Sequence, residues 1–203
     1  MAHIPDGVLT MPVLLGGGAV SAAGTWMGLR QIGPERMPQV AVLSAVFFVA
    51  SLVHLPAGLA SVHLLLNGLM GVVLGMAAYP AIMVALLLQA VLFGFGGLAV
   101  LGVNAANMAV PALLAGWLFR RLRRPGDFSR RTALAAGSAG GGAVAATALL
   151  VAGSLALSGQ DFLPALTVVA ATAAPVMVVE TVFTAAAIGL LARVRPELLD
   201  GQP

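Results

Sequence analysis

Long runs of apolar residues, interrupted by few charged side chains, set the pattern of this sequence. Between Asp6 and Arg30 lie 23 uncharged residues, and from Met37 to Phe119 there are 83 consecutive residues without Asp, Glu, Lys or Arg. A 29-residue uncharged run covers 132–160, and an apolar stretch with one acidic residue follows over 162–192. A helix crosses a bilayer with about 20 residues at a rise of about 1.5 Å each. The pattern therefore predicts an all-α membrane protein.

The 83-residue run decides the number of crossings. Arginines of short loops lie on the cytoplasmic side of a membrane, so Arg36 before the run and Arg120 after it are expected on the same side. The number of helices between them is then even. Two helices would need about forty residues each, whereas four of about twenty fit a bilayer. We expect the breaks at the proline- or glycine-bearing segments 54–58, 78–80 and 93–107.

With one helix before the run and two after it, the sequence predicts about seven transmembrane helices in a single integral membrane domain, 1–203. Residues 1–9 form an extracytoplasmic N-terminus, which lacks the positive start of a cleavable signal peptide, and the C-terminus lies inside. The segment 120–131 carries six of the ten arginines. At this position a cytoplasmic arginine-rich loop is favoured over a nucleic-acid-binding patch. The small residues of 137–146 predict close helix packing, within the chain rather than against a partner.

Composition excludes several classes of function. Charged residues make up 8% of the chain against about 25% in soluble proteins, and the mean hydropathy is +1.04. A cytosolic enzyme is therefore excluded. All ten basic residues are arginine, and cysteine is absent, so a metal site must use nitrogen or oxygen ligands. No zinc-protease helix, serine-hydrolase elbow or P-loop occurs, so the chain is not predicted to be an enzyme, and ATP would act only through other subunits.

The expected topology gathers all three histidines on the outer side. His3 lies close behind the N-terminal amine, and amine, backbone amide and imidazole nitrogens can surround one metal ion in a plane. Such donors suit Ni(II), Cu(II) and, to a smaller degree, Co(II). Binding displaces protons, so affinity should rise with pH. Met1-Ala2-His3 offers four nitrogens, whereas Ala2-His3 alone offers three and needs another, which His63 could supply; a plain surface role for His3 stays open.

Other polar residues are weaker candidates. His63, expected at the start of an apolar helix, is either a ligand or a hydrogen-bonded structural residue, since an isolated imidazole is costly there. His54 is a ligand, an outer group that orients another imidazole, or an interfacial residue. Glu180 lies within the last helix and could pair with a polar group, be protonated or take part in coupling. The remaining possible ligands or supporting groups are Ser61, Asn104 and Asn107, the asparagines being expected to bind loop carbonyls.

Four segments resemble the CbiM/NikM family, the substrate-binding membrane (S) subunits of energy-coupling-factor ABC transporters for cobalt and nickel. These are His3-Ile-Pro-Asp-Gly-Val-Leu9, Leu55-Pro-Ala-Gly-Leu-Ala-Ser-Val-His63, Gly96-Gly-Leu-Ala-Val-Leu-Gly-Val-Asn-Ala-Ala-Asn-Met108 and Val194-Arg-Pro-Glu-Leu-Leu199. The resemblance covers essentially the whole chain. It implies a multi-pass protein of the bacterial or archaeal cell (inner) membrane that binds Co(II) or Ni(II) as its transported substrate.

The resemblance also implies the site and the partners. The ligands would be the N-terminal amine and adjacent amide at Met1 or Ala2, with His3 and His63, and the 104–107 loop would pack around them. A membrane coupling (T) subunit and cytoplasmic ATPase subunits would complete the transporter, and no nucleic acid is involved. The rival hypothesis is a non-transporting membrane interaction or assembly protein whose histidines are structural.

Two departures from the family pattern matter. The family usually begins Met-His, whereas this chain begins Met-Ala-His, so removal of Met1 would restore the register. We therefore predict that Met1 is removed. His54 does not belong to the pattern and could alter metal preference, which leaves cobalt versus nickel open.

Overall fold

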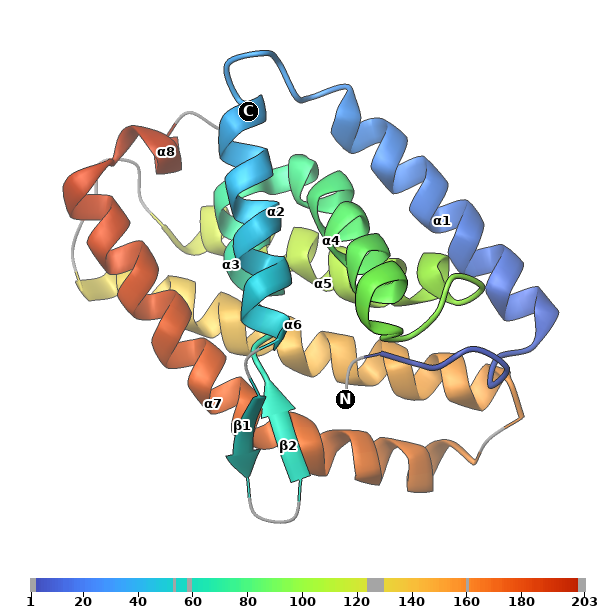
Figure 1. The fold of residues 1–203 in the computed structure, drawn as a ribbon. Coiled ribbons are helices and arrows are strands. Elements are labelled where there is room, and N and C mark those ends of the chain that lie inside the picture. The colour runs from blue at the N-terminus through green and yellow to red at the C-terminus, as the bar shows by residue number, and fades with distance from the viewer. Residues whose placement is uncertain (1–2, 53, 58–59, 124–129, 160, 201–203) are drawn as a thin grey trace.

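A computed structural model describes residues 3–52, 54–57, 60–123, 130–159 and 161–200, without the side chains of 54–57, 60–63, 162, 165 and 200. The chain is almost entirely helical (Figure 1). Its elements are, in order, α1 (Met11–Leu29), α2 (Met37–Leu52), β1 (His54–Ala57), β2 (Ala60–His63), α3 (Asn67–Leu74), the 3-10 turn η1 (Gly75–Ala77), α4 (Ala78–Phe93), α5 (Leu101–Leu122), α6 (Arg130–Leu157), α7 (Phe162–Val194) and α8 (Glu197–Asp200).

Seven helices of eight residues or more, α1–α7, occur in the described chain, which confirms the predicted helical fold and its number of helices. Four segments are long and apolar enough to cross a membrane: Asn67–Phe93, Leu101–Leu122, Arg130–Leu157 and Leu166–Val194. Large apolar side chains also stand exposed on the outside of the bundle, such as those of Leu15, Val42, Val91 and Leu149. An apolar exterior of this kind fits lipid rather than water, so the chain is a multi-pass membrane protein.

The breaks within the long apolar run are only partly as predicted. α4 ends at Phe93, and Gly94 caps it in the left-handed region with φ +68°, as the glycine-rich segment indicated. The break expected at 78–80 comes earlier, at η1, where Gly75 takes φ +58°. The 93–107 segment is not a loop throughout, because α5 already begins at Leu101. Asn104 and Asn107 therefore lie on a helix, and their amides bond to other segments instead of competing for their own backbone.

The helix expected to begin at His63 is also wrong. Residues 54–57 and 60–63 form an antiparallel hairpin in which His54 is the cross-strand partner of His63, and α3 starts only at Asn67. As a result α3 has 8 residues instead of about twenty. The reason lies in α7, where the carboxylate of Glu180 accepts hydrogen bonds from the backbone amides of Leu65 and Leu66. Those amides are satisfied without a helix.

Small residues set the closest helix contacts. α6 and α7 form the most extensive helix contact in the described chain, and Gly137, Gly140 and Gly141 of α6 face Thr181 and Thr184 of α7. This confirms internal packing of the small-residue segment. In lipid, apolar side chains gain little by packing together, so helix association depends on close contact between backbones. Glycine permits this contact because it has no side chain. The same device brings α3 onto α5, where Gly71 lies against the backbone of Ala112 and Gly116.

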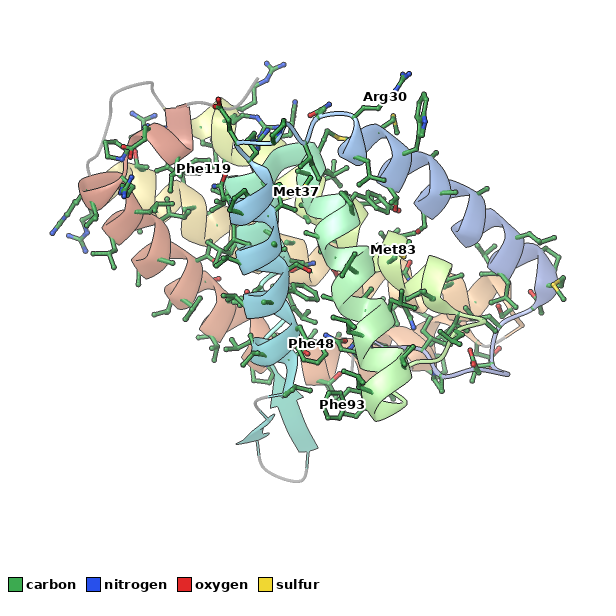
Figure 2. All side chains as sticks on the ribbon, turned by 45° about the horizontal axis from the view of Figure 1, so that its top comes forward. Arg30, Met37, Phe48, Met83, Phe93 and Phe119 are labelled. Carbon is green, nitrogen blue, oxygen red and sulfur yellow. The ribbon has the colours of Figure 1, made fainter. Side chains whose placement is uncertain are left out.

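The described arginines gather at one end of the bundle. Figure 2 shows Arg30, Met37 and Phe119 toward one end and Phe48 and Phe93 toward the other. At the arginine end, Arg36 donates to the carbonyl of Leu74 at 3.2 Å, and Arg123 donates from Nη1 to the carbonyl of Leu199 at 3.0 Å. The hairpin and the N-terminal segment lie at the opposite end (Figure 1). The predicted orientation in the membrane depends on this separation of the arginines from the hairpin and N-terminal segment. The orientation itself stays a prediction.

We expect Gly71→Ala to destabilise the protein. The added Cβ would collide with the carbonyl oxygen of Ala112, a backbone atom that cannot move without shifting α5. Such overpacking costs about 1–3 kcal/mol, against a gain of about 1 kcal/mol in helix propensity. Thermal unfolding in detergent should show a Tm several degrees lower.

Gly142→Ala on α6 is the matched control, because nothing lies within 4 Å of its added Cβ. Its Tm should stay unchanged or rise slightly. Equal Tm values for the two variants would contradict the tight α3–α5 contact.

Candidate metal centre

The N-terminal segment is bound by Asn104 into the end of the bundle that bears the hairpin. The Ile4 amide donates to Oδ1 of Asn104 at 3.0 Å, and Nδ2 of Asn104 donates back to the Ile4 carbonyl at 3.0 Å. Both residues are buried, with 3% and 2% of their surface exposed. The side-chain amide of Asn104 thus pairs with both polar groups of the Ile4 backbone, as a neighbouring strand would. This pairing fixes the position and direction of the chain directly after His3.

Asp6 makes a second connection to the loop between α4 and α5. Its amide donates to the carbonyl of Gly96 at 3.1 Å, and its Oδ1 accepts from the amide of Val100 at 3.1 Å. Figure 1 shows the N-terminal stretch (dark blue) running beside this loop (green). Because two separate points of the segment are held, residues 4–6 cannot swing away as a frayed terminus would.

Two glycines make this close approach possible. Gly96 takes φ +78°, and a Cβ there would lie 2.8 Å from Nδ2 of Asn104. Gly97 takes φ +139°, and a Cβ there would overlap the carboxylate of Asp6. Positive φ is costly for residues other than glycine. The Gly96-Gly97 pair therefore makes room for the N-terminal segment.

His3 is half-buried beside aromatic side chains. Its ring is stacked on that of Phe95, with 6.4 Å between centroids. The row continues through Phe93 to Phe48 at the end of α2, with centroid separations of 5.8 Å at each step. Figure 2 shows Phe93 and Phe48 at the end of the bundle opposite Arg30. The imidazole thus packs against an aromatic ring on one side and stays partly accessible to solvent.

The hairpin carries the two other histidines. The register pairs His54 with His63 and Pro56 with Ser61, and β2 packs against α7 and α2. The side chains of His54, Ser61 and His63 lie outside the described residues, as do Met1 and Ala2 entirely. Among the described residues there is no group of three His, Asp or Glu side chains that could hold a metal. The predicted ligand set is consequently untested as a whole.

The two asparagines have different partners. Asn104 binds the N-terminal segment, whereas Asn107, one helical turn further along α5, exchanges hydrogen bonds with Ser154 of α6 at 3.2 and 3.3 Å. Asn104 thus binds a carbonyl of a non-helical segment, as the sequence predicted. Asn107 instead bonds to a side chain and links α5 to α6.

Sequence reasoning missed three contributors to this region. They are Asp6, Phe95 and the backbone amides of Leu65 and Leu66, to which the sequence pattern assigns no contact. One signal could have identified Asp6, since an acidic residue before Gly7 near the chain start stands alone in an apolar stretch. The partners of Glu180 carry no such signal, because backbone amides look alike in any sequence.

Comparisons with known proteins agree with this architecture. The family model CbiM, described as a cobalt uptake substrate-specific transmembrane region, matches residues 3–198. A putative metal transport protein of Haemophilus influenzae is 39% identical over 98% of this chain and 97% of its own length. The cobalt transport protein CbiM of Geobacter sulfurreducens is 32% identical over 97% of this chain, which spans 61% of that protein. The fused nickel transport protein NikMN of Rhodobacter capsulatus is 38% identical over 74% of this chain, which matches 46% of that protein.

A solved structure described as a transition metal transporter shares the fold. Its TM-score is 0.73 at 23% identity, with 98% of this chain and 94% of that chain covered. The family match and the apolar spans define the class as a multi-pass membrane component of a transporter, and not an enzyme. The chain belongs to the CbiM family of cobalt-uptake substrate-specific transmembrane regions.

Replacing Asn104 with alanine should release the N-terminal segment. Both hydrogen bonds to Ile4 are lost, and each buried bond contributes about 1 kcal/mol or more. We expect exchange of the Ile4 amide to accelerate about 5- to 30-fold, measured by hydrogen–deuterium exchange on N-terminal peptides.

Asn107→Ala on the same helix is the control, because its partner is Ser154 and not the N-terminal segment. Exchange at Ile4 should then be unchanged. Equal acceleration in both variants would indicate a general loosening of α5 and would contradict the anchoring role of Asn104.

Proposed function

We propose that this chain is the substrate-binding membrane component of a cobalt or nickel uptake transporter. It takes Co(II) or Ni(II) from the outside through nitrogens of the N-terminus, His3 and His63, and passes the ion inward with energy-coupling partners. Support comes from the family and from relatives named for cobalt and nickel transport. The observation that carries the proposal is the anchoring of the chain directly behind His3, by Asn104 and Asp6, at the end of the bundle that also bears the hairpin.

The chemistry of the donors supports the choice of metals. After removal of Met1, the Ala2 amine, the His3 amide and the His3 imidazole supply three nitrogens, and the imidazole of His63 is a fourth. Planar nitrogen sets are preferred by Ni(II) and Cu(II), and Co(II) is accommodated. His54, opposite His63 in the hairpin, is an outer group that tunes this set.

Anchoring lowers the cost of binding. A free N-terminus would lose backbone freedom worth about 1–2 kcal/mol for each residue that becomes ordered on a metal. Here residues 4–6 are already held by four hydrogen bonds: two between Ile4 and Asn104, one between Asp6 and Gly96, and one between Asp6 and Val100. The ordering of residues 4–6 is thus complete before the metal binds, and this part of the binding free energy is retained as affinity.

The distribution of charge supports the orientation and the partners. Arginines concentrate at one end of the bundle, which we assign to the cytoplasmic face of a bacterial or archaeal cell membrane. The sequence contains no lysine and hence no P-loop lysine. We infer that cytoplasmic ATPase subunits and a membrane coupling (T) subunit supply the energy at this face.

A free N-terminal amine should be essential for metal binding. Protein with an authentic N-terminus should bind one Ni(II) or Co(II) in calorimetric titration, and His63→Ala should weaken binding by more than about tenfold because a ligand is lost. A Gly-Ser extension ahead of the N-terminus should have a similar effect, since it moves the amine away from His3.

The same extension placed after Pro203 is the control and should leave the affinity unchanged. Negligible, equal binding in wild type and His63→Ala would contradict the transport proposal and favour a membrane assembly protein with structural histidines.

Mass spectrometry of the purified protein should find Ala2 as the first residue. The small alanine permits removal of Met1, and this removal brings His3 into the second position that the family favours. An intact Met1 would contradict this expectation and would indicate the longer Met1-Ala2-His3 chelate.

A further inference from the structure

Glu180 is a carboxylate in the interior of α7 with two backbone partners. Its Oε1 accepts from the amide of Leu65 at 2.6 Å and from the amide of Leu66 at 2.7 Å, and none of its surface is exposed. The two short bonds therefore join α7 firmly to the segment between β2 and α3.

The segment that Glu180 binds has an unusual backbone. Leu66 takes φ +50°, the only positive φ at a non-glycine residue in the described chain. For leucine this conformation costs on the order of 1–2 kcal/mol, and it persists only where the surroundings impose it. Glu180 imposes this conformation of Leu66, because the amides of Leu65 and Leu66 must both point at its Oε1 atom.

The opposite end of this segment is fixed independently. Nδ2 of Asn67 donates to Oγ1 of Thr147 at 2.9 Å and to the carbonyl of Met108 at 3.3 Å, which ties the start of α3 to α6 and α5. His63 lies only two residues before Leu65. Two residues of extended chain span about 7 Å, so the clamp on Leu65 restricts where the end of β2 can lie.

A simple structural ion pair does not account for Glu180. No cation pairs with it in the part of the chain that the structure describes, and its Oε2 is buried without a hydrogen-bond partner there. The buried Oγ1 of Thr184, one turn along α7, is likewise unpartnered. A buried carboxylate without a cation is costly, and an ionisable residue within a membrane is a candidate for function. In the described part of the chain, the interactions that offset this cost are the hydrogen bonds from the amides of Leu65 and Leu66.

We propose that Glu180 is a positioning residue for metal binding, holding His63 in place through the amides of Leu65 and Leu66. This inference rests on the proposed function, because it gives His63 the role of a ligand. It assigns to α7, whose C-terminal end lies among the arginines, a direct link to the hairpin at the outer end.

A double-mutant cycle tests the proposal. Glu180→Met keeps the side-chain volume but removes the acceptor, so Ni(II) affinity should fall about 10-fold or more. Glu180→Gln retains Oε1 as an acceptor and should restore affinity to within about threefold of wild type. In a His63→Ala background, Glu180→Met should cost little further affinity, because both changes remove the same ligand. The visible absorption of the Ni(II) complex should show the same loss of a nitrogen donor in Glu180→Met and His63→Ala.

Thr184→Val is the control on the same helix, since it removes a buried hydroxyl that has no described partner. Its affinity and spectrum should match the wild type. If Glu180→Met does not yield folded protein, Glu180→Asp, whose carboxylate is one methylene shorter, takes its place in the cycle and should also lower affinity.

The outcomes separate this inference from the function on which it rests. Wild-type binding combined with additive losses in the double variant, or with equal losses in Glu180→Met and Glu180→Gln, would overturn the positioning role alone. Absence of metal binding by the wild type would overturn the proposed function and this inference with it.

Discussion

The two hydrogen bonds between Asn104 and Ile4 are the interaction on which the hairpin end of this molecule depends. A chain terminus normally frays, because nothing repays the entropy lost by ordering it. Here the amide of Asn104 satisfies the donor and the acceptor of one backbone unit in a buried setting, where leaving either unpaired would be costly. Residues 4–6 are thus part of the helical bundle. This anchoring is required if a terminal amine is to serve as a ligand.

The same rule operates throughout the bundle. Buried polar side chains reach the backbone of a different segment: Ser44 bonds to the carbonyl of Ala81, Asn67 to that of Met108, and Glu180 to the amides after β2. Apolar side chains gain little by packing together in lipid, so such bonds and glycine contacts specify which helices meet. The N-terminal segment, the Gly96-Gly97 turn and the segment after β2 are therefore each held to the bundle by a few directional hydrogen bonds.

Sequence alone predicted the features that depend on apolar runs and charge. The helical fold, the seven helices and the break after Phe93 follow from apolar runs between arginines and glycines. It failed where a distant side chain overrides local preference. Asn104 continues a helix because its amide has Ile4 as a partner, and residues 60–63 form a strand because Glu180, 114 residues beyond Leu66, holds the following backbone. Such contacts produce no recognisable pattern in the sequence. The ligand role of His63, whose side chain lies outside the described residues, stays a prediction.

X-ray absorption spectroscopy of the Ni(II)-loaded protein with an authentic N-terminus tests the central claim most directly, because it reports the donor atoms around the metal. The account predicts a planar first shell of four nitrogens with the multiple-scattering signature of two imidazole rings, one from His3 and one from His63. A six-coordinate, oxygen-rich shell, or a shell without imidazole, would contradict it.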